Sequence, residues 1–137
     1  MKVNPIFIDE FVSPLIGGAD RDNEFEYFKC NPDLEQDVKF LCNNLLIPEF
    51  KQQIEQIREV AKNTLAYYLF YKTFDFHSKL DSLLLPMKTP NNSVLFFLWL
   101  WNEFFDRESF DYIKNEMVVE EFNVDEPLKL IMKHKNK

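Results

Sequence analysis

The sequence predicts an all-α fold, a single-domain bundle of five or six helices with an irregular N-terminal segment. Two observations support this prediction. The 137-residue chain contains only two glycines, whereas most β-hairpins and phosphate-binding loops need glycine for positive φ angles. Apolar residues also recur at steps of three and four along several stretches, which places them on one face of a helix. The seven prolines separate these stretches from one another.

Length and composition predict one folded domain over residues 1–137. A chain of this size buries roughly two-thirds of its unfolded surface, and 46% of its residues are hydrophobic, including fifteen phenylalanines. Residues 1–30 are expected to form an extended or irregular arm, as one short strand or a peptide lying over the core. Residues 31–134 should form the helical core, and residues 135–137 a frayed tail.

The compartment is predicted from what the chain lacks. No apolar stretch of signal-peptide length follows the N-terminus. The longest apolar run, Val94–Trp101, has eight residues, against the ~20 needed to cross a bilayer. We therefore expect a cytoplasmic protein with no membrane partner, in which Cys30 and Cys42 stay reduced.

Two helices are predicted in the first half of the core. Asn31 should cap the first helix, with Pro32 at its first position. Its apolar face is expected to consist of Leu34, Val38, Leu41 and Leu45. A second helix should begin at Pro48 and run to about Phe76, a length of ~43 Å.

The second half of the core should begin with a helix from about Ser93 to Asp106, apolar on every side until Asn102. A further helix is expected over roughly Glu108 to Val119, with Phe110, Ile113 and Met117 facing inward. Asp125 should cap a last helix that carries Leu128, Ile131 and Met132. In one alternative, residues 117–124 form a strand beside Val3–Ile8, which would add a minor β element.

No catalytic or metal-binding motif is found. A cysteine nucleophile needs a base, and His77 is the only histidine outside the basic C-terminal tail. His77 has Asp75 and Asp81 nearby, but it lacks the second histidine one turn away that a helical zinc site would use. The sequence therefore predicts a protein that is not an enzyme and holds no cofactor or metal.

The clearest charged feature is the stretch Glu103–Glu126, where nine of twenty-four residues are carboxylates and only Arg107 and Lys114 oppose them. Its net charge of −7 equals that of the whole chain. Soluble domains usually intersperse both signs. On the predicted helix over 108–119, the outer half would present Glu108, Asp111, Tyr112, Asn115, Glu116 and Val119. Such a surface suits a basic protein partner, and the sequence pI near 4.8 argues against nucleic acid.

In character, the chain resembles the immunity proteins that bacteria produce together with secreted or contact-delivered toxins. The resemblance lies in the acidic run Glu103–Glu126, the aromatic stretch Val94–Phe105 and the lack of a recognisable active site. It implies tight binding of a cognate basic toxin, typically a nuclease, with Tyr112 as a packed anchor. It also implies that toxin lysines and arginines pair with Glu108, Asp111, Glu116, Glu120 and Glu121.

Two other functions stay open at this point. A phage or mobile-element protein could use the same acids to mimic nucleic acid, which requires them to be spaced along an extended face. A small helical enzyme or ligand-binding protein could instead use a pocket between helices, lined by the aromatic residues of the stretch Val94–Phe105. The oligomeric state is not predicted.

Overall fold

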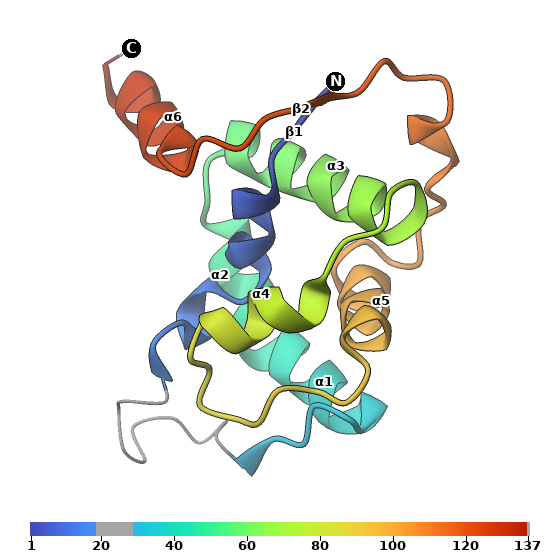
Figure 1. Ribbon diagram of the computed structural model, residues 1–137. Coiled ribbons are helices and arrows are strands. Elements are labelled where there is room, and N and C mark those ends of the chain that lie inside the picture. The colour runs from blue at the N-terminus through green and yellow to red at the C-terminus, as the bar shows by residue number, and fades with distance from the viewer. Residues whose placement is uncertain (19–28, 137) are drawn as a thin grey trace.

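The computed structural model describes residues 1–18 and 29–136, and it confirms the predicted all-α class (Figure 1). Part of the predicted arm over residues 1–30, residues 19–28, lies outside the described residues. The α-helices are α1 (Glu35–Leu41), α2 (Ile47–Lys51), α3 (Glu55–Phe70), α4 (Phe76–Ser82), α5 (Ser93–Phe104) and α6 (Glu126–Lys135). A small parallel sheet pairs β1 (Lys2–Val3) with β2 (Val119–Glu120).

The N-terminal segment is part of the core, where an extended arm was expected. After β1, two 3-10 helices cover Pro5–Phe11 and Ser13–Leu15. The first is capped by the Asn4 side chain, which accepts from the Ile6 amide at 3.1 Å. It lies between α3 and α4 (Figure 1), and Lys79 of α4 pairs with its Asp9 at 2.6 Å. Its apolar residues Phe7, Ile8 and Phe11 are fully buried.

The first predicted helix begins later than expected. The Asn31 side chain accepts from the Asp33 amide at 3.0 Å and so closes a turn, and α1 starts only at Glu35. A π-helical segment, Cys42–Leu46, then joins α1 to α2. This widening comes just before Pro48, whose ring has no N–H to donate to the preceding turn.

The long helix predicted from Pro48 to about Phe76 is wrong, because the chain breaks twice. The first break separates α2 from α3 at residues 52–54, and the second follows the end of α3 at Phe70. Asp75 then caps α4 and accepts from the Ser78 amide at 3.0 Å. Its side chain offers the backbone an alternative to continued helix.

The central helix α5 is confirmed, although it ends at Phe104 rather than Asp106. The Asn92 side chain caps it and accepts from the Leu95 amide at 3.0 Å. Trp101 is fully buried, whereas Trp99 is partly exposed. The helix is short, and none among the described residues is long and apolar enough to cross a membrane.

The helix predicted over residues 108–119 is wrong. Asp106 and Arg107 adopt left-handed φ angles of 52° and 58°, which turn the chain away from α5. In a helix, the Glu108 carbonyl would accept a hydrogen bond from the amide four residues later. Here it accepts one from the Trp101 indole N–H at 2.8 Å. Only a 3-10 turn, Asp111–Ile113, forms in this segment. Ile113 is buried as expected, but Met117 is 84% exposed.

The strand alternative for residues 117–124 is confirmed over Val119–Glu120, but its partner is Lys2–Val3 rather than Val3–Ile8, since Pro5–Phe11 is a 3-10 helix. β2 pairs in parallel with β1, with Lys2 opposite Val119 and Val3 opposite Glu120. The Val119 amide donates to the Met1 carbonyl, and the Glu121 amide donates to the Val3 carbonyl, both at 2.8 Å. The sheet thus joins the beginning of the chain to the segment that leads into α6.

Aromatic rings fill the centre of the molecule, so the ring stretch of α5 is core rather than a pocket. Phe11 stacks on Phe50 with ring centroids 5.1 Å apart, and Phe104 meets both rings edge-on. Edge-to-face pairs at this distance are favourable beyond the area they bury.

Phe11→Ala should lower the free energy of unfolding by about 3–5 kcal/mol, because it empties a ring-sized volume in a closed core. Phe122→Ala is the matched control, since the Phe122 ring is 67% exposed and its loss should change stability by less than about 0.5 kcal/mol. Urea unfolding of both variants measures the difference, and equal losses would contradict this placement of Phe11.

Candidate partner-binding surface

The seven residues predicted to contact a partner lie along one segment, but they do not form a helix face. Glu108, Asp111, Tyr112, Asn115 and Glu116 are exposed on the loop around the 3-10 turn. Glu120 belongs to β2, and Glu121 follows it directly; both are partly exposed.

Three of the five predicted acids form ion pairs within the molecule. Glu108 forms an ion pair with Lys62 of α3. Glu120 pairs with Lys72 at 2.7 Å, and Glu121 lies 3.6 Å from the ammonium of Lys2. The stretch is therefore less anionic at its surface than its sequence predicts. Asp111 and Glu116 form no ion pair with any lysine or arginine of the described residues.

Glu120 is the most firmly held of these carboxylates. Besides Lys72, the Tyr68 hydroxyl donates to it at 2.7 Å. The Lys72 ammonium, followed by the Tyr68 hydroxyl, lowers the pKa of Glu120. Burial raises the pKa of Tyr68, and the neighbouring Glu120 adds to this rise. Glu120 therefore stabilises the sheet end against α3 and is poorly suited to contact a partner.

Tyr112 is anchored to α3 and is only partly open to solvent. Its hydroxyl donates to the Asn63 side chain at 2.8 Å, and the Lys62 ammonium lies 5.6 Å from the centre of its ring. Burial raises the pKa of Tyr112, with further contributions from Glu108 and Glu59. The ring is thus already rigid before any partner arrives, which lowers the entropic cost of using it as a contact.

A groove of about 440 Å³ opens beside this loop, between α3, the N-terminus and the start of α6. Its lining consists of Met1, Lys2, Gln56, Glu59, Val60, Asn63, Glu116, Glu126 and Leu130. Val60 and Leu130 provide apolar surface, whereas Glu59 and Glu116 are exposed carboxylates. Neither of these two acids is paired with a cation in the described part of the chain.

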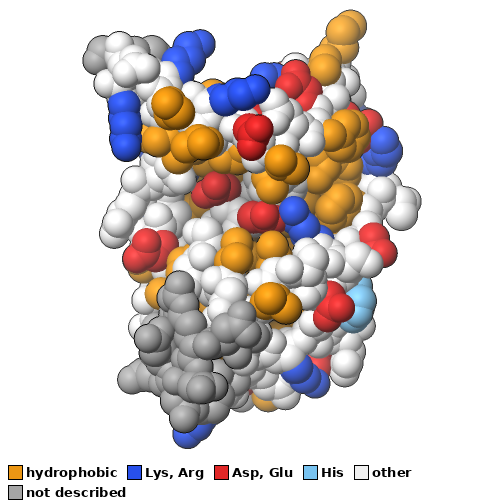
Figure 2. All heavy atoms as spheres, turned by 60° about the vertical axis from the view of Figure 1, so that its left-hand side comes forward, with side chains coloured by type: hydrophobic (Ala, Val, Ile, Leu, Met, Phe, Trp, Pro, Cys, Tyr) orange, Lys and Arg blue, Asp and Glu red, His pale blue; other side chains and the backbone are white. Residues whose placement is uncertain are grey.

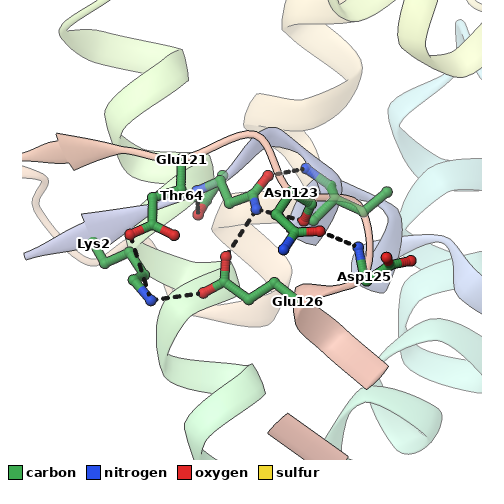
Figure 3. A network of polar contacts seen from close by, with 8 residues as sticks. Lys2, Thr64, Glu121, Asn123, Asp125 and Glu126 are labelled. Atoms are coloured by element: carbon green, nitrogen blue, oxygen red, sulfur yellow. Dashed lines mark hydrogen bonds and ion pairs between the residues drawn. The ribbon is translucent and has the colours of Figure 1, made fainter. Parts of the chain in front are cut away.

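Glu126 lines the groove and is structural, and its polar contacts are drawn in Figure 3. Its carboxylate accepts from the Asn4 side-chain amide at 2.9 Å and pairs with Lys2 at 3.2 Å. The Asn4 backbone amide donates in turn to the Thr64 hydroxyl at 3.1 Å. Glu126, more than any other group, raises the pKa of Lys2. This network ties the N-terminus, α3 and α6 together.

The geometry supplies no activated nucleophile among the groups considered from the sequence. Burial raises the pKa of Cys30 to about 11, and it raises the pKa of Cys42 still further. Both thiols are therefore protonated at neutral pH and weakly nucleophilic. Within residues 1–18 and 29–136, no three histidine, cysteine or acidic side chains are grouped to hold a metal ion.

Together, the fold and the groove define a small all-α protein with an acid-lined surface groove next to the sheet that joins its N-terminus to the segment before α6. Comparisons with protein-family models, with characterised proteins and with solved structures find no match to this chain.

The groove also contains residues that the sequence reasoning missed. Gln56, Glu59 and Asn63 follow one another at steps of three and four on the exposed side of α3. That spacing is a polar stripe opposite the buried Ile57 and Ala61, and it could have been found from the sequence. Its position next to Glu116 could not, because the two segments are more than fifty residues apart.

Glu126→Ala should lower the free energy of unfolding by about 1–3 kcal/mol, because the buried Asn4 amide loses its acceptor. Glu121→Ala is the matched control. The Glu121 side chain is 39% exposed, against 10% for Glu126, so its loss should cost less than about 0.5 kcal/mol. Chemical denaturation compares the free energies of unfolding of the two variants. A larger loss of stability for Glu121→Ala would contradict the network of Glu126 with Asn4 and Lys2.

Glu120→Gln should destabilise the protein at neutral pH but not in acid. Folding lowers the pKa of Glu120, so its stabilising contribution is present above the unfolded pKa, about 4.3, and is lost as the pH falls through the folded value. The stability difference between wild type and variant should therefore shrink below about pH 4. Denaturation at a series of pH values measures it.

The Lys72→Gln background provides the control for this pH effect. In this background, Glu120→Gln should lower the free energy of unfolding by less than it does in the wild type, because the Lys72 ammonium that favours the ionised carboxylate is absent. A loss of stability on Glu120→Gln that does not change with pH would contradict the ion pair with Lys72. A loss of the same size in the Lys72→Gln background would also contradict it.

Proposed function

We propose that this protein binds and neutralises a basic protein partner, as a toxin-immunity protein does, and that the groove beside Tyr112 is its contact site. The single observation that carries the proposal is the pair Glu59 and Glu116, two carboxylates lining one groove that no cation of residues 1–18 and 29–136 pairs with. A lysine or arginine from a partner fits this arrangement. Its aliphatic stem would lie along Val60 and Leu130 while its charge meets the two acids.

The rigid surroundings of the groove support the same function. Tyr112 is fixed by Asn63, and Glu126 is fixed by Asn4 and Lys2. A preorganised site loses little conformational entropy on binding, so more of the contact energy contributes to affinity. Tyrosine at the edge of a charged groove is a common anchor in protein interfaces.

The distribution of the acids favours a toxin partner over nucleic-acid mimicry. Mimicry needs charges spaced along an extended face, whereas Glu59 and Glu116 gather at one groove and Lys62, Lys72 and Lys2 interrupt the acidic stretch Glu103–Glu126. A nuclease as the toxin rests on the resemblance, whereas the cytoplasmic location is proposed from the short apolar runs of the sequence.

The product of the adjacent gene is the natural candidate partner, and co-expression tests it. The wild-type chain should suppress the toxicity of that product, and binding should weaken as salt rises. Glu59→Lys/Glu116→Lys should abolish protection by repelling a basic side chain from the groove. Glu35→Lys/Glu49→Lys is the control with the same charge change, since both residues are exposed outside the groove.

Protection that survives Glu59→Lys/Glu116→Lys would exclude the groove as the contact site. Binding that is insensitive to salt would remove the electrostatic basis of the proposal.

A further inference from the structure

The segment from Phe122 to Met132 carries an apolar face that nothing in the described structure covers. Phe122, Val124, Leu128 and Met132 are between 55% and 69% exposed. Leu128 and Met132 stand one turn apart on α6 and therefore share a face. Single exposed apolar residues are ordinary on soluble proteins, but four within eleven residues form a patch of the kind that marks an interaction site.

This face is also cationic. Lys129 and Lys133 lie next to Leu128 and Met132 on α6, and both are exposed. Neither pairs with an acid of the described residues. α6 stands out from the body of the molecule (Figure 1), and hydrophobic and lysine side chains lie side by side where it comes forward (Figure 2).

The groove with Glu59 and Glu116 begins directly beside α6, since Leu130 of α6 forms part of its lining. Leu130 is only partly exposed and turns toward the groove, whereas Lys129 and Lys133 turn to solvent. The lysines of α6 therefore do not meet the acids of their own groove. One molecule thus presents a groove with two carboxylates that no described cation pairs with and, next to it, a helix with exposed apolar and lysine side chains.

We propose that a second copy of this chain covers the exposed face of α6, with Lys129 and Lys133 of each copy placed at Glu59 and Glu116 of the other. Because the two surfaces are adjacent, a two-fold axis brings them together twice and closes the assembly at a dimer. The apolar side chains of α6 would lie at the centre of this contact and the ion pairs at its rim.

Charge favours a second copy over a lipid surface. A second copy offers Glu59 and Glu116 within one groove as partners for the two lysines, and this local pairing has to outweigh the repulsion between two chains that each carry a net charge of −7. A neutral bilayer would leave the lysines without a partner. The contact is small, so the dimer should be weak and should dissociate on dilution.

This inference goes beyond the proposed function and does not rest on it. The dimer would occupy the same groove as a basic partner, so the two states exclude each other and the dimer would be the partner-free form. The variant Lys129→Glu/Lys133→Glu separates the two ideas. It should be monomeric and still protect against the partner, because its groove is intact.

Sedimentation velocity over a range of protein concentrations tests the dimer. The mass of the wild type should rise from 16.5 kDa toward twice that value, and it should return to the monomer at high salt. Lys129→Glu/Lys133→Glu and Glu59→Lys/Glu116→Lys should each be monomeric. An equimolar mixture of the two variants should again form a dimer, because every reversed charge then meets its opposite.

Leu128→Ser/Met132→Ser should raise the dissociation constant of the dimer by more than ~10-fold through lost apolar contact. Circular dichroism melting of all variants serves as the control for folding. A wild type that stays monomeric at every concentration would overturn the proposal, as would a dimer that the charge-reversed mixture fails to restore. A monomer that binds vesicles of anionic lipid would assign the α6 face to a membrane surface instead.

Discussion

The rest of the structure depends on the hydrogen bonds of one buried residue, Asn4. Its backbone amide donates to Thr64 of α3, and its side-chain amide donates to Glu126 and to the carbonyl of Asn123. Its side-chain oxygen accepts from Ile6 and so starts the N-terminal 3-10 helix. One residue, through its backbone amide and its side chain, thus fixes the directions of three segments, and a buried polar group with every partner in place specifies a single arrangement. The groove exists because these segments meet there.

The electrostatic surface is set by which lysines the fold brings to the acidic stretch. Lys62 reaches it from α3, Lys72 from the turn that follows α3, and Lys2 from β1. No local charge pattern indicates these pairs, since the partners are far apart in sequence. Folding thereby converts a stretch that is uniformly acidic in sequence into a few neutralised ion pairs and a small set of free carboxylates. The free carboxylates, rather than the total charge, decide what the surface can attract.

The sequence predicts the fold best where a local cap and an apolar run agree. Asn92 and the run that follows it define α5 almost to the residue. The helix prediction fails over residues 108–119. There, the helical spacing of Phe110 and Ile113 is outweighed by a tertiary hydrogen bond from the Trp101 indole to the Glu108 carbonyl. For the candidate site, too, the sequence predicts local features but not the tertiary packing. Its residues are visible as local polarity, but their grouping at one groove depends on how α3 packs against the C-terminal segment.

The groove and α6 are linked through Glu126, which lies at the first position of the helix and also lines the groove. Its bonds to Asn4 and Lys2 hold the root of α6 firmly, while Leu128 and Met132, farther along, contact little of the body. A helix fixed at one end keeps its outer face at a constant orientation to the groove. That constancy is what a self-complementary surface requires, because a freely swinging α6 would lose its alignment with the acids of a second copy.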